Sequence, residues 1–180
     1  MIIAIDTSQM TYSIAISHGN NSDITSHEWE DVQITLSDML SDLDYKKIEA
    51  IIICSGPGRY SGIRSAAAFA QGVHAATNCP VYSLSSFELI QGKVTESDDY
   101  SIVLEARKGQ VYQQVVTQNK VYPAVTIDFP NIKTPAFGNL EHPCVEYITY
   151  DARDLLQYFN HHKDKITLGV SLHYLRKPTE

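Results

Sequence analysis

The apolar positions along the chain follow two different periods, which predict strands alternating with helices. Short apolar runs typical of buried strands stand at Ile2–Ile5, Ser13–Ile16, Ala50–Cys54 and Pro80–Leu84, with a weaker strand signal over 22–29. Between them, apolar side chains recur at helical spacing over 34–43 and 63–77. Ser85, followed by Glu88 three residues later, has the capping-box pattern that predicts the start of another helix. The sequence therefore predicts an α/β fold.

The two predicted helices of the first half differ in how much of their surface is apolar. The helix over 34–43 is amphipathic, and its apolar face is Leu36, Met39, Leu40 and Leu43. The helix over 63–77 consists mostly of alanine and is apolar nearly all round. Its first stripe is Ile63, Ala66, Ala70 and Val73, and its second is Ala68, Phe69, Gly72 and Ala76. A helix that is apolar on all sides is expected to be buried on all sides.

Two different neighbours could cover this helix, and the pattern leaves both open. One is the rest of the chain itself. The other is a second protein chain, in which case the two predicted helices form half of an intermolecular bundle. The predicted partner interface then consists of Leu36, Met39, Leu40, Leu43, Ile63, Ala66, Phe69, Ala70 and Val73.

The second half of the chain begins like the first half. YSIVLE at 100–105 parallels MIIAID at 1–6, and each run ends in a carboxylate before a polar turn and a second strand. This weak repeat predicts two related lobes. The polar segment Thr95–Asp99 sets the boundary, which gives a first lobe over 1–97 and a second, degenerate and shortened lobe over 98–180. Prolines interrupt the second lobe, and only Asp151–His161 is expected to be helical there.

Composition narrows the classes of protein that fit. The chain of 180 residues is 43% hydrophobic, which is enough for a sizeable core. Its net charge of −7, with only 14 Lys and Arg, argues against a protein that grips nucleic acid alone. The cysteines Cys54, Cys79 and Cys144 are widely spaced and fit a reducing compartment. Neither a signal peptide nor a membrane span is expected, so a cytoplasmic location is predicted.

The glycine-rich segment GPGRYSG at 56–62 joins a strand to a helix, where phosphate-binding loops are often found. It matches neither a Walker A loop, because Ile63 stands where lysine is needed, nor the third glycine of a dinucleotide fingerprint. Ser61 is one position too late for a serine nucleophile elbow. We therefore interpret Gly56, Pro57, Gly58, Ser61 and Gly62 as a structural joint, in which Ser61 caps the helix.

Asp6 and Thr7 stand in the turn between the first two strands, where an acid can face a nucleotide phosphate or its magnesium. Actin-type phosphate loops have a glycine two positions after the acid, and Ser8 takes that place here. The plainer interpretation is that Asp6 caps the turn with its carboxylate. The seven histidines form no ligand pattern, so no metal site is predicted.

Four motifs, in order along most of the chain, resemble the TsaB family, also called YeaZ. They are Ile5–Thr7, the specific motif Gly56–Arg64, and the supporting motifs Glu105–Tyr112 and His173–Arg176. Arg59 stands where that family usually has a small residue, and Glu105 replaces the common aspartate. The resemblance also suggests that Arg64 ties down the first turn of the helix that follows the glycine-rich joint.

The resemblance implies an ASKHA (actin-like) fold with two related lobes. It implies a non-catalytic subunit of the machinery that makes threonylcarbamoyladenosine next to the anticodon of tRNAs. Such a subunit binds a catalytic TsaD-like subunit through helices of the first lobe, and a TsaE-like ATPase joins them. Alone, the chain is expected to form a homodimer, to contact tRNA only indirectly and to hold no cofactor. Weak or shared ATP or ADP binding is expected only in the complex.

Two other functions compete with the scaffold. An actin-like ATPase or kinase would use Asp6 and Thr7 as a working nucleotide site rather than a vestigial one. A protease, a description that relatives of this family have carried, finds no nucleophile–base pair and no HExxH motif in the sequence.

Overall fold

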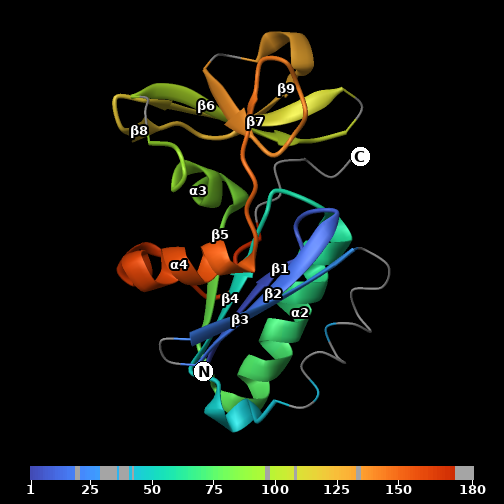
Figure 1. Ribbon diagram of the computed structural model, residues 1–180, viewed down its shortest axis with the longest axis vertical. Helices are drawn as coiled ribbons and strands as arrows, with labels where there is room; N and C mark the ends of the chain where they lie inside the picture. The colour runs from blue at the N-terminus through green and yellow to red at the C-terminus, as the bar shows by residue number, and fades with distance from the viewer. Residues whose placement is uncertain are drawn as a thin grey trace.

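Two mixed β-sheets, one above the other in Figure 1, organise the chain. The computed structural model describes residues 1–18, 21–28, 36, 41, 43–95, 98–107, 109–132 and 135–172. The lower sheet has the strand order β12-β5-β4-β1-β2-β3, and the upper sheet has the order β11-β10-β6-β7-β8, with β9 also paired to β7. The alternation of strands and helices confirms the predicted α/β class.

The first sheet is built on the apolar runs that the sequence marks most clearly. Its strands are β1 (Ile2–Asp6), β2 (Thr11–His18), β3 (Asn21–Glu28), β4 (Ala50–Cys54), β5 (Val81–Leu84) and β12 (Thr167–Leu168). β1 pairs antiparallel with β2 and parallel with β4, and β4 pairs parallel with β5. Central strands of this kind are covered on both faces, which explains why they read as continuous apolar runs.

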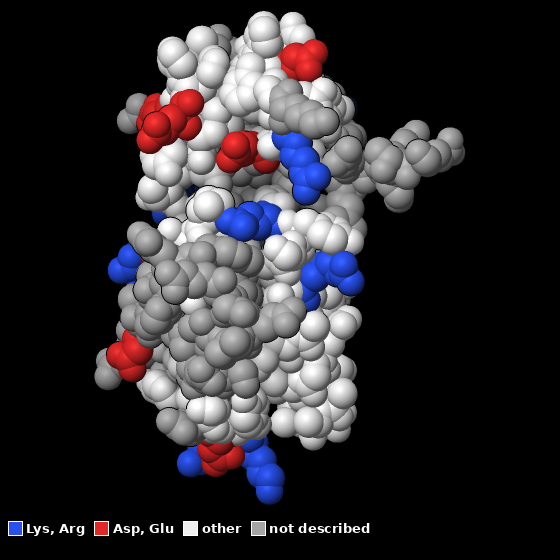
Figure 2. Space-filling view, turned by 90° about the vertical axis from the view of Figure 1, so that its right-hand side faces the viewer, with Lys and Arg blue, Asp and Glu red and all other residues white. Residues whose placement is uncertain are grey.

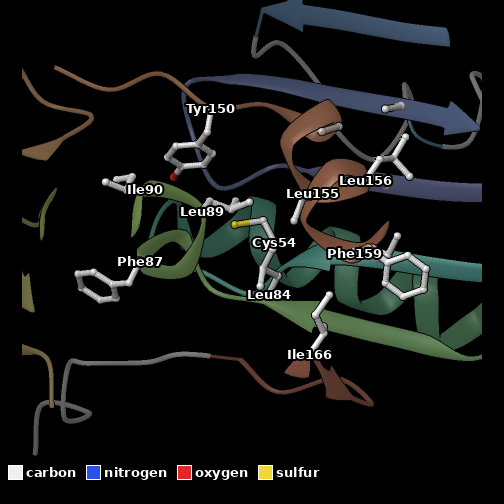
Figure 3. Close-up of a cluster of buried hydrophobic side chains, with 14 of the residues drawn as sticks. Cys54, Leu84, Phe87, Leu89, Ile90, Tyr150, Leu155, Leu156, Phe159 and Ile166 are labelled. Carbon is white, nitrogen blue, oxygen red and sulfur yellow. The ribbon is translucent and has the colours of Figure 1, made fainter. Parts of the chain in front are cut away.

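Alternate residues of the central strands contribute to two separate cores. Ile3 and Ile5 point to α2 (Tyr60–Thr77) and pack against its alanines. Ala4 and Ile52 point the other way and pack in a cluster with residues of α3 (Ser86–Gln91) and α4 (Ala152–His162). Figure 3 shows this second cluster, in which Leu155 and Phe159 of α4 lie over Cys54 and Leu84 of the sheet. The first sheet is therefore a middle layer between helices.

The second sheet repeats the beginning of the first. Its strands are β6 (Asp99–Glu105), β7 (Gln110–Thr117), β8 (Lys120–Val121), β9 (Val125–Asp128), β10 (Ala136–Gly138) and β11 (Glu146–Tyr147). β6 pairs antiparallel with β7 and parallel with β10, just as β1 pairs with β2 and β4. The repeat read from the sequence is thus a repeat of topology, and the fold has two related lobes.

The last part of the chain returns to the first sheet. α4 packs on β1, β2 and β4, and β12 pairs with β5. The predicted boundary near residue 97 lies in the connection between α3 and β6, but residues 152–168 do not follow the second sheet, as the division at 97 implied. The reason is physical: Leu155, Leu156 and Phe159 form an apolar stripe, and it covers the face of the first sheet that α2 leaves bare.

The structure shows the helices predicted after Ser85 and Asp151, but it describes little of the one predicted over 34–43. α4 begins after Asp151, whose side chain accepts a hydrogen bond from the Arg153 backbone N–H, and Ser85 caps α3 in the predicted capping box. Short 3-10 turns lie at Tyr45–Lys47, Phe129–Asn131 and Lys163–Lys165. Most of the helix predicted over 34–43 lies outside the described residues. Among those that are described, no helix has the length and apolarity that crossing a bilayer needs.

Candidate functional site

The turn after β1 is closed by its own hydrogen bonds. Asp6 is completely buried, and its Oδ1 accepts hydrogen bonds from the Ser8 backbone N–H (2.9 Å) and the Ser8 hydroxyl (2.7 Å). The Gln9 side-chain amide donates to Asp6 Oδ2 at 2.8 Å. Burial raises the pKa of the Asp6 carboxyl, and the hydrogen bonds from Ser8 and Gln9 offset part of that effect. Asp6 therefore caps its turn, as the plainer interpretation of the sequence predicted.

The glycine-rich joint is pressed against this turn. The Arg59 backbone N–H donates to Ser8 O at 2.7 Å, and the Thr7 hydroxyl donates to Gly62 O at 2.8 Å. A Cβ on Gly58 would lie 2.3 Å from Ser8 O, so only glycine allows this close approach. Gly56 has a φ of 89°, a value that glycine adopts without strain. The two segments together leave Thr7 and Ser8 buried.

Residues from distant parts of the chain close the turn from the other side. The Tyr150 hydroxyl lies 3.3 Å from the Ser8 hydroxyl, and Gln9 also donates to Tyr150 O at 2.9 Å. The Ser86 hydroxyl donates to Pro57 O at 3.0 Å and lies 3.3 Å from Cys54 Sγ. Figure 3 shows Tyr150 and Cys54 on either side of Leu89. Tyr150, Gln9 and Ser86 were not singled out by the sequence, and no local pattern could reveal contacts between such distant positions.

Burial also governs the chemistry of the other ionisable groups here. It raises the pKa of the Cys54 thiol to about 12, and the nearby Asp6 carboxylate adds to that shift. Burial raises the pKa of Tyr150 as well, again helped by Cys54 and Asp6. A thiol with so high a pKa is not a nucleophile at neutral pH. Among the described residues, no group of three or more His, Cys, Asp or Glu side chains could hold a metal ion.

The first stripe of the alanine-rich helix faces the sheet rather than a free surface. Ala66, Ala70 and Val73 are buried in the core between α2 and the sheet, and Ile63 is buried as well, so their placement in a partner interface needs correction. The physical reason is that the sheet needs one complete apolar face of the helix, and this stripe carries the larger aliphatic side chains. Phe69 is half-buried at the border of the same core.

The predicted positions of the preceding helix can be followed only in part. Leu36 is buried, at 2% exposure, in the core that α2 makes with the sheet, and Leu43 packs against it. Leu36 is therefore a core position rather than part of a free interface, and Leu43 is half-buried at the border of the same core. Met39 and Leu40 lie outside the described residues.

The second stripe of α2 is the exposed one. The side chains on this outer face are small or polar, namely Ser61, Arg64, Ala68, Gln71, Gly72, Ala75 and Ala76. A Cβ on Gly72 would meet no atom within 4 Å. The outer face of α2, defined by these seven residues, is therefore exposed, with open space at Gly72.

The start of α2 differs from the prediction in its cap. The N-cap residue is Arg59, without a side-chain cap bond, and Ser61 lies inside the helix and is exposed. Ser61 is therefore not the cap that the sequence suggested, because the helix begins at Tyr60, two positions before the start that a cap at Ser61 would give. Arg64 does tie down this first turn: its Nη1 donates to the Tyr60 hydroxyl at 3.2 Å, and its guanidinium lies 5.1 Å from the centroid of the Tyr60 ring.

The chain is similar in sequence to proteins of one known family. A family model described as TsaD, tRNA N6-adenosine threonylcarbamoyltransferase, matches residues 30–132, which is more than half of the chain. Two relatives are each described as tRNA threonylcarbamoyladenosine biosynthesis protein TsaB. The one from Buchnera aphidicola is 29% identical over 80 residues, covering 43% of this chain and 36% of the relative. The one from Bacillus subtilis is 27% identical over 120 residues, covering 62% and 52%. The chain belongs to the TsaD family, and it is similar to proteins named TsaB.

Solved structures of the TsaB (YeaZ) group confirm the fold. The crystal structure of an uncharacterized protein with similarity to peptidase YEAZ from Pseudomonas aeruginosa superposes with a TM-score of 0.72 at 19% identity, covering 97% of this chain and 99% of that one. YeaZ from Pseudomonas aeruginosa gives a TM-score of 0.69 at 18% identity, covering 91% and 92%. The chain thus shares the two-lobed α/β fold of these structures, as the resemblance implied. The matched regions span about a third to a half of the length of the two TsaB relatives.

Proposed function

We propose that this chain is a non-catalytic scaffold for threonylcarbamoyl transfer to the adenosine next to the anticodon of tRNAs. In this role it binds and supports a catalytic TsaD-like subunit, and a TsaE-like ATPase joins the assembly in the cytoplasm. The proposal is supported by the relatives, which are named for threonylcarbamoyladenosine biosynthesis, and by the matching family model, which is named for the transferase. The tRNA is then held mainly by the other subunits, because this chain carries a net charge of −7.

The closed turn at Asp6 is the observation that carries the proposal. A nucleotide site at this turn would need carboxylate or hydroxyl oxygens that a phosphate or its magnesium can reach. Instead, both Asp6 oxygens accept hydrogen bonds from Ser8 and Gln9, and Tyr150 lies against Ser8. Opening the turn would break these bonds and separate it from the joint at Gly58. We therefore propose that the turn is structural and that nucleotide binds, if at all, only in the complex.

The outer face of α2 is the surface we propose for the partner. Small side chains let another helix approach closely, and a partner would cover the alanines that now face water. A variant such as Val73→Asp is unsuitable as a test, because Val73 belongs to the core and the change would unfold the chain. Ala68→Gln and Gly72→Gln add bulk without charge at exposed positions, and glutamine is a good helix former.

The test is the molar mass by light scattering of the chain alone and mixed with its TsaD-like subunit. We expect a homodimer that converts to a heterodimer, and we expect Ala68→Gln and Gly72→Gln to weaken both associations. Asn160→Gln, on the exposed side of α4, is the matched control and should leave both intact. A wild-type chain that is monomeric in both samples would contradict the scaffold.

ATP turnover separates the scaffold from an actin-like ATPase or kinase. We expect the chain alone to hydrolyse no ATP and to transfer no threonylcarbamoyl group, and to raise the transferase activity of the TsaD-like subunit. Turnover by the isolated chain that is lost in Asp6→Ala would favour the ATPase instead.

A further inference from the structure

Four side chains, three exposed and one half-buried, form a cluster where the turn after β1 meets the start of α2. The Arg59 guanidinium contacts the Met10 sulfur, and Met10 is 68% exposed. Tyr60, the next residue along the chain, is 54% exposed. The Arg64 guanidinium lies over the Tyr60 ring and donates a hydrogen bond to its hydroxyl. We call Met10, Arg59, Tyr60 and Arg64 the waist cluster, because α2 begins at the level where the two lobes meet (Figure 1).

The waist cluster is basic on an acidic protein. The chain has a net charge of −7, yet two of the four side chains are arginines. The ion pairs formed among the described residues do not include Arg64, whose guanidinium contacts the neutral Tyr60. Figure 2 shows several Lys and Arg side chains at mid-height on one side of the molecule, with an acidic side chain beside them. Within the part of the chain that the structure describes, no carboxylate pairs with Arg64, so this guanidinium can attract carboxylates of another molecule.

The backbone beneath the cluster is held firmly. The Arg59 N–H donates a hydrogen bond to Ser8 O, and the Arg59 carbonyl oxygen accepts one from the Ile63 N–H at 3.0 Å. Both backbone polar groups of Arg59 are therefore hydrogen-bonded. Gly58 lies in direct contact with Ser8, and Thr7 is bonded to Gly62. Binding by a surface that is already ordered costs less conformational entropy than binding by a loose loop. This firm support favours a docking role over chance exposure.

We infer that the waist cluster is the anchor of a protein–protein interface and docks on a carboxylate-bearing surface of the catalytic subunit. This inference rests on the proposed function and adds the place and chemistry of its strongest contacts. Tyr, Met and Arg are the residue types enriched in interfaces, and Tyr and Arg dominate their energetic centres. The cluster is continuous with the outer face of α2, since Arg64 belongs to both. The small residues of the outer face of α2 let the partner approach. The waist cluster supplies the arginine charges and the Tyr60 ring, which the partner would bury.

A polynucleotide is the other anionic ligand to weigh, and the chain's charge argues against it. Binding of nucleic acid strengthens with each phosphate that a basic side chain neutralises. Two arginines on a chain of net charge −7 provide little of this attraction. A few carboxylates on a folded partner need only local complementarity, which the cluster offers.

The test compares charge reversals in the full chain binding to its TsaD-like subunit. We expect Arg59→Glu and Arg64→Glu each to weaken binding about tenfold or more, chiefly at low salt, where the charges are least screened. Lys46→Glu is the matched control, because it changes the net charge equally at an exposed residue near the other end of α2 (Figure 1). Met10→Asp repeats the test in the turn before β2, where the side chain supports no core.

The outcomes separate this inference from the proposed function. If Gly72→Gln weakens binding and the waist-cluster variants do not, the inference that the waist cluster anchors the interface is wrong, and the proposed scaffold function is retained. If the wild-type chain does not bind the subunit at all, both fail. If the arginine variants keep partner binding but lose binding to a labelled 20-nucleotide poly(U) RNA, the cluster is a nucleic-acid surface and the inference is overturned. Thermal melts of each variant confirm that the fold is retained.

Discussion

Asp6 is a buried carboxyl whose ionisation depends on its neighbours, and it gives the chain a specific pH dependence. Burial raises its folded-state pKa above the ordinary value of 3.8. The folded state then binds the proton more tightly than the unfolded state, so its contribution to stability falls as pH rises from 3.8 through the raised pKa. We predict that Asp6→Asn removes this pH-dependent loss of folding stability. The measurement is the urea midpoint of both proteins between pH 4 and 8.

Only the difference between the two proteins is informative, because other carboxyls also titrate in acid. The wild-type midpoint should fall relative to that of Asp6→Asn as pH rises. Parallel curves over the whole range would contradict a raised pKa at Asp6, and would mean that the bonds from Ser8 and Gln9 fully compensate for burial.

Gly58 and Gly72 make a matched pair of glycines in opposite surroundings. An alanine Cβ at 58 would lie 2.3 Å from Ser8 O, which is backbone and cannot swing aside. Gly58→Ala should therefore cost about 1–3 kcal/mol of unfolding free energy through overpacking. At Gly72 the Cβ enters open space inside a helix, so Gly72→Ala should stabilise the chain by about 0.5–1 kcal/mol. Urea unfolding measures both, and equal effects would contradict the close contact at Ser8.

At the scale of single elements, α4 depends on the cap at Asp151. The Asp151 side chain accepts hydrogen bonds from the Arg153 backbone N–H at 2.7 Å and from the Arg153 guanidinium. Asp151→Ala should cost about 1 kcal/mol of unfolding free energy by leaving the first turn uncapped. Asp164→Ala, an exposed change just after α4, is the control and should have little effect.

The pH dependence of the same cap has the opposite sign to that of Asp6. Burial would raise the pKa of Asp151, but the bonds and charge of Arg153 outweigh it and hold the pKa below 3.8. A lowered folded pKa gives stability that is present above 3.8 and is lost as pH falls through the folded value. The difference between wild type and Asp151→Ala in urea should thus shrink in strong acid, and a constant difference would contradict the lowered pKa.

The sequence predicts those elements that depend on residues close together in the chain. It does not predict which face of a helix is buried when two faces are apolar. The Ile-rich strands β1 and β4 and the capping boxes at Ser85 and Asp151 depend on residues close in sequence. α2 carries two apolar stripes, and helical spacing alone does not say which one meets the sheet. The stripe with the larger side chains, Ile63 and Val73, is the buried one, and the alanine stripe is left outside.

At the scale of the whole molecule, the candidate site is formed by contacts that sequence patterns do not encode. Asp6, Thr7 and the joint at Gly58 were identified from the sequence, since each stands at the end of a strand. Tyr150 lies 142 positions after Ser8, and only the return of the chain to the first sheet brings them together. The same return explains why the predicted second lobe is longer than the observed one: a repeat at the start of each lobe carries no information about where the end of the chain packs.

This return predicts that the first lobe cannot fold from residues 1–97 alone. Without α4 and β12, the face of the sheet that holds Ala4, Ile52 and Leu84 is exposed to water, and β5 loses its outer neighbour. We expect this fragment to show no cooperative unfolding transition in urea followed by circular dichroism. A chain that joins 1–97 to 151–172 through a short Gly/Ser linker restores both elements and should unfold cooperatively, although less stably than the full chain. A fragment 1–97 that unfolds as sharply as the linked chain would show that α4 is dispensable. It would also make the first lobe an independent unit, which the shared core of α3, α4 and the sheet argues against.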